Sequence, residues 1–192
     1  MKYIQSFLKM NCSSELLDLF RTVHNPIKEI SESYAAFRHC KSLLNFNDVT
    51  TNVFIGDGSR CLTGALFSFM RGKNNIVENI SIDPLINQRI LEDWMDEHNV
   101  ENFKYFNTKF QELHYNTNDT FNIILVHSHV DIYEVDKIIP NWNYMYVNPC
   151  CMRDKQIFNF DYMKEHNIVC LKFGKDNNIL SDKNEVFIYK KY

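Results

Sequence analysis

The first 47 residues carry apolar side chains at helical spacing, which predicts a helical extension. A serine pair at 13–14, followed by an acidic residue and an apolar rhythm up to Phe20, is typical of a capped amphipathic helix. Pro26 interrupts this pattern. A second helix is therefore expected from about Glu29 to Leu44.

From residue 48 onward, short apolar runs rich in β-branched and aromatic residues alternate with helix-like segments. Five of these runs are predicted strands, at 52–55, 79–82, 103–106, 121–126 and 143–147. Helices are expected over 62–70 and around Ile90–Met95. Strands that alternate with helices form a mostly parallel sheet with helices on both faces.

Two more apolar runs near the end of the chain, 168–173 and 186–189, are joined by a polar loop and predict an antiparallel hairpin. The hairpin would add an antiparallel edge to the sheet. We therefore predict an α/β, three-layer sandwich built on a seven-stranded sheet. Residues 1–192 are expected to form a single domain, with the helical extension (1–47) packed on an α/β core (48–192).

The composition narrows the class of protein. With 192 residues, 45% apolar and 23% charged, the chain can bury a core and shows no sign of general disorder. A net charge of −3 and a pI near 6.2 lack the basic footprint of a dedicated nucleic-acid binder. Because no apolar run suits a membrane helix and the first ten residues lack a signal-peptide pattern, we expect a cytoplasmic protein without a membrane partner.

The cysteines do not predict a structural metal site. The six are irregularly spaced and include no C-x-x-C pair, so zinc of the finger or ribbon type is not expected. We interpret them as reduced thiols, mostly in the core.

A glycine turn follows the first predicted strand, with the sequence Gly56-Asp57-Gly58-Ser59. Open α/β sheets bind ligands beyond the carboxyl ends of their strands, and glycines let the backbone approach a ligand closely. The turn does not match the dinucleotide fingerprint, because Cys61 holds the third glycine position. A strand, a G-x-G turn and a helix are also compatible with a simple tight turn.

Asp83, followed by Pro84, ends the second predicted strand about 25 residues after the glycine turn. An acid at this position can bind the two hydroxyls of a ribose. The alternative interpretation is that Asp83 caps the next helix, since Asp-Pro suits a helix start.

This order of elements resembles the Rossmann-like class I S-adenosylmethionine-dependent methyltransferases. The similarity covers roughly residues 48–192 and extends to the closing segment IVCLKFGKDNNILSDKNEVFIYK and to the motifs VFIGDGS, SIDP, VHSH and NPCC. Together these motifs resemble a little-characterised, divergent branch of methyltransferase-like proteins.

The resemblance implies S-adenosylmethionine as the cofactor and assigns residues to its parts. The methionine end would contact Gly56, Asp57, Gly58 and Ser59; the ribose Asp83 and Pro84; the adenine Asn107; and His127 would also lie at the cofactor. These enzymes usually carry an acid two residues before the first glycine, where this chain has Phe54, and Asp57 is the candidate to replace it.

Two more polar clusters follow the fourth and fifth predicted strands. His127 and His129 come after one strand, and Asn148, Cys150 and Cys151 come after the other. Neighbouring strands lie about 4.8 Å apart, so these loops should meet at one rim beside the cofactor site. Imidazole and thiolate groups there could act as a base, as a nucleophile or as metal ligands.

We expect His127, His129, Asn148 and Cys150 to contribute to catalysis. If strand geometry continues past the fourth strand, only one of the two histidines points into the site. One of the adjacent cysteines could equally be a plain core residue.

Three functional hypotheses follow. The first is a methyltransferase that binds S-adenosylmethionine, with an unknown small-molecule, protein or RNA acceptor. The second is a catalytically inactive scaffold of the same fold that docks a protein partner through its N-terminal helices. The third is a metal-assisted hydrolase that uses His127 or His129 together with Cys150 or Cys151.

Overall fold

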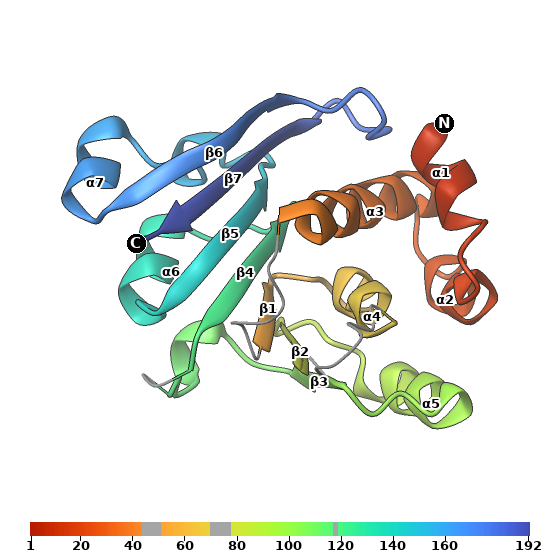
Figure 1. The fold of residues 1–192 in the computed structure, drawn as a ribbon. Helices are drawn as coiled ribbons and strands as arrows, with labels where there is room; N and C mark the ends of the chain where they lie inside the picture. Colours follow the sequence, from red (N-terminus) through yellow and green to blue (C-terminus); the bar gives the residue numbers. More distant parts are fainter. Residues whose placement is uncertain (44–50, 70–77, 117–118) are drawn as a thin grey trace.

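A seven-stranded sheet forms the centre of the computed structural model, which describes residues 1–43, 51–69, 78–116 and 119–192 (Figure 1). The strands are β1 (Thr51–Ile55), β2 (Glu78–Ile82), β3 (Phe103–Phe106), β4 (Phe121–Val126), β5 (Trp142–Asn148), β6 (Ile168–Lys175) and β7 (Glu185–Lys191). The helices are α1 (Lys2–Phe7), α2 (Ser13–Phe20), α3 (Pro26–Leu43), α4 (Leu62–Ser68), α5 (Gln88–His98), α6 (Ile132–Ile138) and α7 (Phe160–Glu165). Two short 3-10 helices complete these elements, η1 (Phe110–Glu112) and η2 (Arg153–Lys155).

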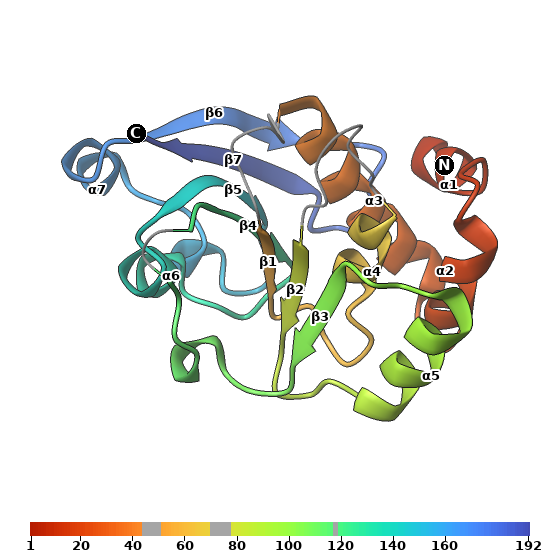
Figure 2. The same ribbon diagram turned by 60° about the horizontal axis from the view of Figure 1, so that its bottom comes forward.

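The strand order is β3-β2-β1-β4-β5-β7-β6, which confirms the predicted α/β fold. β1 to β5 are parallel to one another, and β7 runs antiparallel between β5 and β6. The chain adds β2 and β3 on one side of β1 and then returns to place β4 on the other side (Figure 2). The order therefore reverses between β1 and β4, which is where open α/β sheets bind ligands.

Alternating strand residues face two separate hydrophobic layers. In β1, Phe54 packs toward α3 and α4, whereas Val53 and Ile55 pack toward the α6 side. β4 follows the same pattern, with Ile124 on the first side and its neighbours on the second. Because both faces are covered, these strands appear in the sequence as continuous apolar runs.

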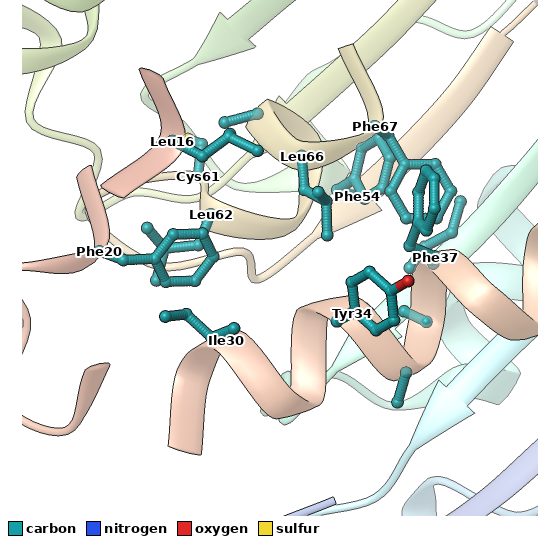
Figure 3. Close-up of a cluster of buried hydrophobic side chains, with 14 of the residues drawn as sticks. Leu16, Phe20, Ile30, Tyr34, Phe37, Phe54, Cys61, Leu62, Leu66 and Phe67 are labelled. Carbon is teal, nitrogen blue, oxygen red and sulfur yellow. The ribbon is translucent and has the colours of Figure 1, made fainter. Parts of the chain in front are cut away.

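The N-terminal helices are part of the first of these layers. Phe20, Tyr34 and Phe37 belong to the same buried cluster as Phe54 of β1 (Figure 3). Phe67 of α4 joins them, with ring centroids 5.8 Å from Phe37 and 5.0 Å from Phe54. The N-terminal helices therefore bury these aromatic side chains against β1 and α4.

Two predicted helix starts are corrected. Cys12, not a serine, is the N-cap of α2, and the hydroxyl of Ser14 instead donates a hydrogen bond to Glu15. Pro26 is the first residue of α3 rather than a break before it, because the first helical position needs no N–H donor. The predicted boundary at 47/48 and the predicted helix ends at Leu44 and Met70 lie outside the described residues.

The sequence pattern predicted the region of α1 as helical without giving its bounds, and it did not predict helices α6 and α7. All three are short, at six, seven and six residues, so apolar periodicity has little length in which to emerge. Among the described helices, none combines the length and apolar character needed to cross a membrane.

Three buried asparagines form a ladder across the central strands. Nδ2 of Asn52 donates to Oδ1 of Asn79 on β2, and Nδ2 of Asn122 on β4 donates to Oδ1 of Asn52, both at 2.9 Å. Each of the three residues is about 1% exposed, so the two hydrogen bonds pair their amides within the buried sheet. The ladder fixes the relative register of β2, β1 and β4.

A buried carboxylate joins the elements on the other side of the sheet. Asp136 of α6 accepts hydrogen bonds from Nε1 of Trp142, the hydroxyl of Tyr162 and Nζ of Lys191, each at 2.7 Å. These donors come from β5, α7 and β7. One side chain thus connects four elements of the fold.

Candidate functional site

A cavity of about 620 Å³ opens beyond the carboxyl ends of β1, β2 and β4. Ile55 and Ile82 end two of these strands and line it, together with both glycines of the turn, Gly56 and Gly58. Its volume lies in the range of small-molecule sites, and it occupies the place where the strand order reverses.

The glycine turn has the conformation that its two glycines allow. Gly56 and Gly58 have φ of +71° and +73°, in the left-handed region that side chains rarely adopt. A side chain at Gly56 would also crowd Ser128, whose Cβ lies 3.0 Å from the position of the missing Cβ. The turn is therefore closely packed against the loop that follows β4.

Asp57 faces away from the cavity and supports helix α4. Its carboxylate accepts hydrogen bonds from the backbone N–H groups of Thr63 (3.1 Å) and Gly64 (2.9 Å) and from the hydroxyl of Ser81 (2.8 Å). The N-cap residue of α4, Cys61, makes no side-chain capping bond, so Asp57, which precedes it in the sequence, caps the helix instead. Asp57 is not among the residues that line the cavity, so its expected contact with the methionine end stays a prediction that this conformation does not support.

Asp83 lines the cavity, and Pro84 lies beside it there. One carboxylate oxygen accepts from the N–H of Gly58 at 3.0 Å, and the other accepts from the N–H of Leu85 at 2.7 Å. The alternative role as a cap of α5 is wrong, because Asn87 is the N-cap of that helix. Each carboxylate oxygen retains a second lone pair, so Asp83 can still accept hydrogen bonds from a ligand.

Ser59 and Asn107 are not among the residues that line the cavity. The backbone carbonyl of Ser59 accepts from the N–H of Asn87, and Nδ2 of Asn107 donates to the carbonyl of Ile86. Both residues therefore support the loop that precedes α5. At the end of β3 the cavity instead meets the segment 108–111, which the sequence did not indicate.

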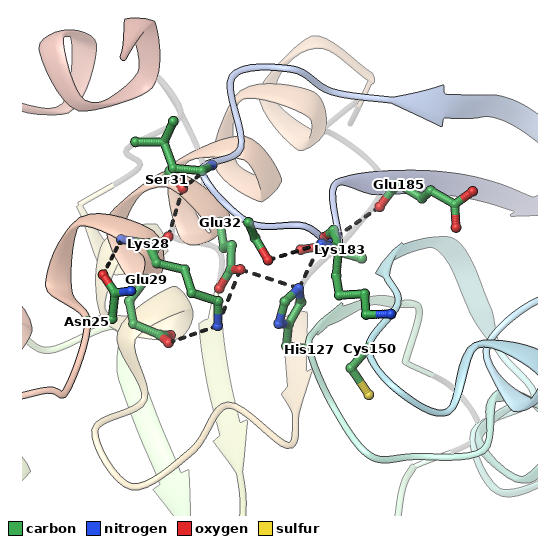
Figure 4. A network of polar contacts seen from close by, with 12 residues as sticks. Asn25, Lys28, Glu29, Ser31, Glu32, His127, Cys150, Lys183 and Glu185 are labelled. Atoms are coloured by element: carbon green, nitrogen blue, oxygen red, sulfur yellow. Dashed lines mark hydrogen bonds and ion pairs between the residues drawn. The ribbon is translucent and has the colours of Figure 1, made fainter.

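His127 lies at the cavity and contacts the N-terminal extension. Its Nε2 is 3.3 Å from Oε1 of Glu32 on α3 and 3.2 Å from the carbonyl of Lys183 (Figure 4). Burial lowers the pKa of His127, which favours the neutral imidazole.

Glu32 is a buried carboxyl group whose side chain is 1% exposed. Lys28, one helical turn earlier, places its Nζ 3.5 Å from Oε1 of Glu32 and also 3.5 Å from Glu29 (Figure 4). Burial outweighs the attraction of Lys28 and raises the pKa of Glu32 from 4.5 to about 7. No pattern in the sequence pointed to this residue, which lies on a helix far from the predicted motifs.

Both histidines line the cavity, although only one was expected to do so. β4 ends at Val126, and His127 has a φ of +48°, so the alternation of the strand stops there. His127 faces Glu32, whereas Nε2 of His129 lies 3.6 Å from Sγ of Cys151. The two imidazoles therefore have different partners.

Asn148 and Cys150 are buried and are not among the cavity residues. Nδ2 of Asn148 donates to the carbonyls of Lys183 (2.9 Å) and Glu185 (2.8 Å), which fixes the start of β7. Sγ of Cys150 lies 3.4 Å from the carbonyl of Ser128. Neither residue is among those that line the cavity, so their predicted catalytic role gains no support from this conformation and stays a prediction.

The α6 side of the cavity consists of residues that the sequence did not point to. Asp131, Glu134 and Lys155 line this side, and Lys109 lies on the β3 side. Asp131 is also the N-cap of α6 and accepts from the N–H of Tyr133. The cavity therefore carries both acidic and basic groups.

Comparison with known proteins supports the fold. No protein-family model matches the chain, and no curated protein matches its sequence. Solved methyltransferase structures do match it at low sequence identity, and the chain has the class I S-adenosylmethionine-dependent methyltransferase fold.

Three solved structures illustrate the likeness. A variant of MtNAS in complex with S-adenosylmethionine is 15% identical, with a TM-score of 0.56 over 100% of this chain and 71% of that one. A SAM-dependent methyltransferase from Leishmania major is 14% identical (TM-score 0.52; 93% and 82% covered). Coclaurine N-methyltransferase bound to N-methylheliamine and SAH is 10% identical (TM-score 0.55; 83% and 72% covered). At these identities the likeness establishes the fold and leaves the reaction to be argued from the site.

Proposed function

We propose that this chain binds S-adenosylmethionine in the cavity where the strand order reverses, between β1 and β4, and transfers its methyl group to an acceptor. The observation that carries the proposal is the convergence of the glycine turn and Asp83 on that cavity. Structures of the same fold have been solved with S-adenosylmethionine or SAH bound, which supports the choice of cofactor.

In this proposal, different cavity residues contact different parts of S-adenosylmethionine. Asp83 accepts hydrogen bonds from the ribose hydroxyls with the lone pairs that Gly58 and Leu85 leave unused. Asp131 and Glu134 offer negative charge to the cationic parts of the ligand. When bound, S-adenosylmethionine supplies an electrophilic methyl group, and the protein has to place the acceptor in line with it.

A base beside the acceptor would take the proton that the acceptor loses. His127 is poorly placed for this role, because its Nε2 already faces Glu32 and a backbone carbonyl. The cavity lining does not favour one class of acceptor, since it carries both acidic and basic groups.

A second candidate function is a scaffold of this fold without methyl transfer. The position that usually carries an acid is Phe54, which is buried, and Asp57 is used to cap α4. These two observations favour weak cofactor binding or none.

Calorimetric titration with S-adenosylmethionine and with SAH distinguishes the two functions. We expect Asp83→Asn to weaken binding by roughly 10- to 150-fold, which corresponds to the loss of about 1.5–3 kcal/mol from a charged hydrogen bond. Asp57→Asn is the matched control, because it also disturbs backbone hydrogen bonds near the turn but changes no residue that lines the cavity.

Asp83→Asn also carries a cost in stability. Both oxygens of Asp83 accept from backbone N–H groups, and the amide replaces one acceptor by a donor, so we expect a loss of about 1–3 kcal/mol. Binding is therefore compared at a temperature where both variants are folded. No heat of binding at millimolar cofactor with folded parent protein would exclude the methyltransferase, and equal effects of the two variants would exclude the role of Asp83.

A further inference from the structure

Three potential metal ligands converge beside the cavity, on the loops that follow β4 and β5. Sγ of Cys151 lies 3.6 Å from Nε2 of His129 and 3.9 Å from Sγ of Cys150. All three ligand atoms lie within 4.8 Å of one another. We propose that His129, Cys150 and Cys151 bind a zinc ion at the edge of the cavity.

The spacing of the ligand atoms agrees with tetrahedral zinc. Bonds of about 2.3 Å to sulfur and about 2.0–2.1 Å to nitrogen place two sulfurs about 3.8 Å apart and a sulfur and a nitrogen about 3.6 Å apart. The sulfur pair here is 3.9 Å apart, and Cys151 and His129 are 3.6 Å apart. Two of the three pairs therefore already have the spacing of a tetrahedral site, and the third pair, Cys150 and His129, lies within 4.8 Å.

A buried glutamine holds the two loops in this arrangement. Oε1 of Gln156 accepts from the N–H of Cys150 at 2.9 Å, while its Nε2 donates to the carbonyl of Ser128, the residue before His129. Gln156 is fully buried, so its geometry is fixed by packing. Polar groups that orient the ligands in this way raise the affinity of a metal site.

The chemistry of the site is consistent with binding of the free ion. Cys151 and His129 are exposed, which gives the ion access, and Cys150 is buried behind them. Coordination converts both thiols to thiolates and releases two protons to the solvent. The carbonyl of Ser128 then loses the S–H of Cys150 and keeps the hydrogen bond from Gln156.

Three protein ligands leave one coordination position for water or another ligand. This number is typical of catalytic zinc, whereas structural zinc usually has four protein ligands. His129 itself lines the cavity, so the ion would lie next to whatever the cavity binds. The inference concerns the metal alone and does not require that S-adenosylmethionine binds.

The test uses the full, reduced chain and Co²⁺ as a spectroscopic substitute for Zn²⁺, without cofactor. We expect one equivalent of Co²⁺ to produce thiolate-to-cobalt charge-transfer absorption and the intense visible bands of tetrahedral cobalt. Zn²⁺ should then displace the cobalt and abolish these bands. Cys151→Ala and His129→Ala change exposed side chains, and each should weaken Zn²⁺ binding by more than about 100-fold, since loss of even a supporting residue costs about 10- to 100-fold.

Two matched variants control for other cysteines and histidines. Cys170→Ala removes a half-buried thiol on β6 that lies outside the site. His98→Ala removes the histidine of the second group of potential ligands, formed with Asp18 and Glu97. Both should bind Zn²⁺ as the parent does.

Several results would overturn the proposal. They are the absence of charge-transfer absorption from folded, reduced protein, unchanged binding by Cys151→Ala, and binding that is lost in His98→Ala. A disulfide between Cys150 and Cys151 in protein kept under reductant would also overturn it. Failure to bind S-adenosylmethionine would leave these metal measurements unaffected.

Discussion

Glu32 offers a quantitative test of the contact between the N-terminal extension and the site. Its side chain is 1% exposed, and burial raises its pKa from 4.5 to about 7. Between these two pH values the folded protein retains a proton on Glu32 that the unfolded chain has released. The parent therefore loses stability as pH rises through this window, and the contribution of Glu32 is fully present only below about pH 4.5.

The variant Glu32→Gln removes this titration and keeps the size of the side chain. Each pH unit between the two pKa values corresponds to about 1.4 kcal/mol of stability. At pH 7 the free energy of unfolding of the variant should therefore exceed that of the parent by about 3 kcal/mol. We expect nearly equal stabilities at pH 4.5, a growing advantage of Glu32→Gln up to pH 7, and no further change above it.

Urea unfolding at intervals from pH 4.5 to pH 8 measures this difference. Glu29→Gln is the control, because it removes the other carboxylate beside Lys28, one that is 36% exposed, and should change stability by less than about 0.5 kcal/mol at any pH. A variant that is less stable than the parent at pH 8 would refute the reasoning. It would mean that attraction to Lys28 and His127 outweighs the cost of burying the charge.

Three further variants test the sheet and the turn by chemical unfolding. Asn52→Ala removes the centre of the asparagine ladder and should cost about 2–5 kcal/mol, because two buried amides each lose a partner; a loss under 1 kcal/mol would contradict this. Gly58→Ala should cost about 1–2 kcal/mol from its positive φ alone, and Gly56→Ala clearly more, since Ser128 crowds that position; equal losses would refute the steric argument. Asp136→Ala should cost about 3–5 kcal/mol by leaving three donors unpaired, and an unchanged unfolding midpoint would contradict this.

The sheet could be predicted from the sequence because its central strands are buried on both faces. Such strands form uninterrupted apolar runs, and the predicted range 121–126 matches β4. The edge strand β3, of which only Phe103 is buried, also has its predicted bounds of 103–106. The short helices α6 and α7 could not be predicted in the same way. Each has only about two turns, and the sequence of α6, IYEVDKI, has too few positions to separate a helical period from a strand.

The sequence predicted where the candidate site lies, but it predicted the direction of only some of its side chains. Asp83 and the two glycines line the cavity as the order of elements suggested. The direction of Asp57 could not be derived, because it depends on Cys61 leaving the start of α4 uncapped, a fact of the folded backbone. The positive φ of His127 is another local feature, although histidine is one of the residue types that adopt it more readily.

The contact between Glu32 and His127 changes how the helical extension should be understood. The sequence suggested that the N-terminal helices could dock a protein partner, and that idea requires surface that is free for binding. Phe20 is fully buried, and Glu32 reaches the cavity through His127, so this part of the extension already serves the fold and the site. A partner would therefore have to bind the outer surface of these helices, where Leu8 and Ile27 are about half exposed.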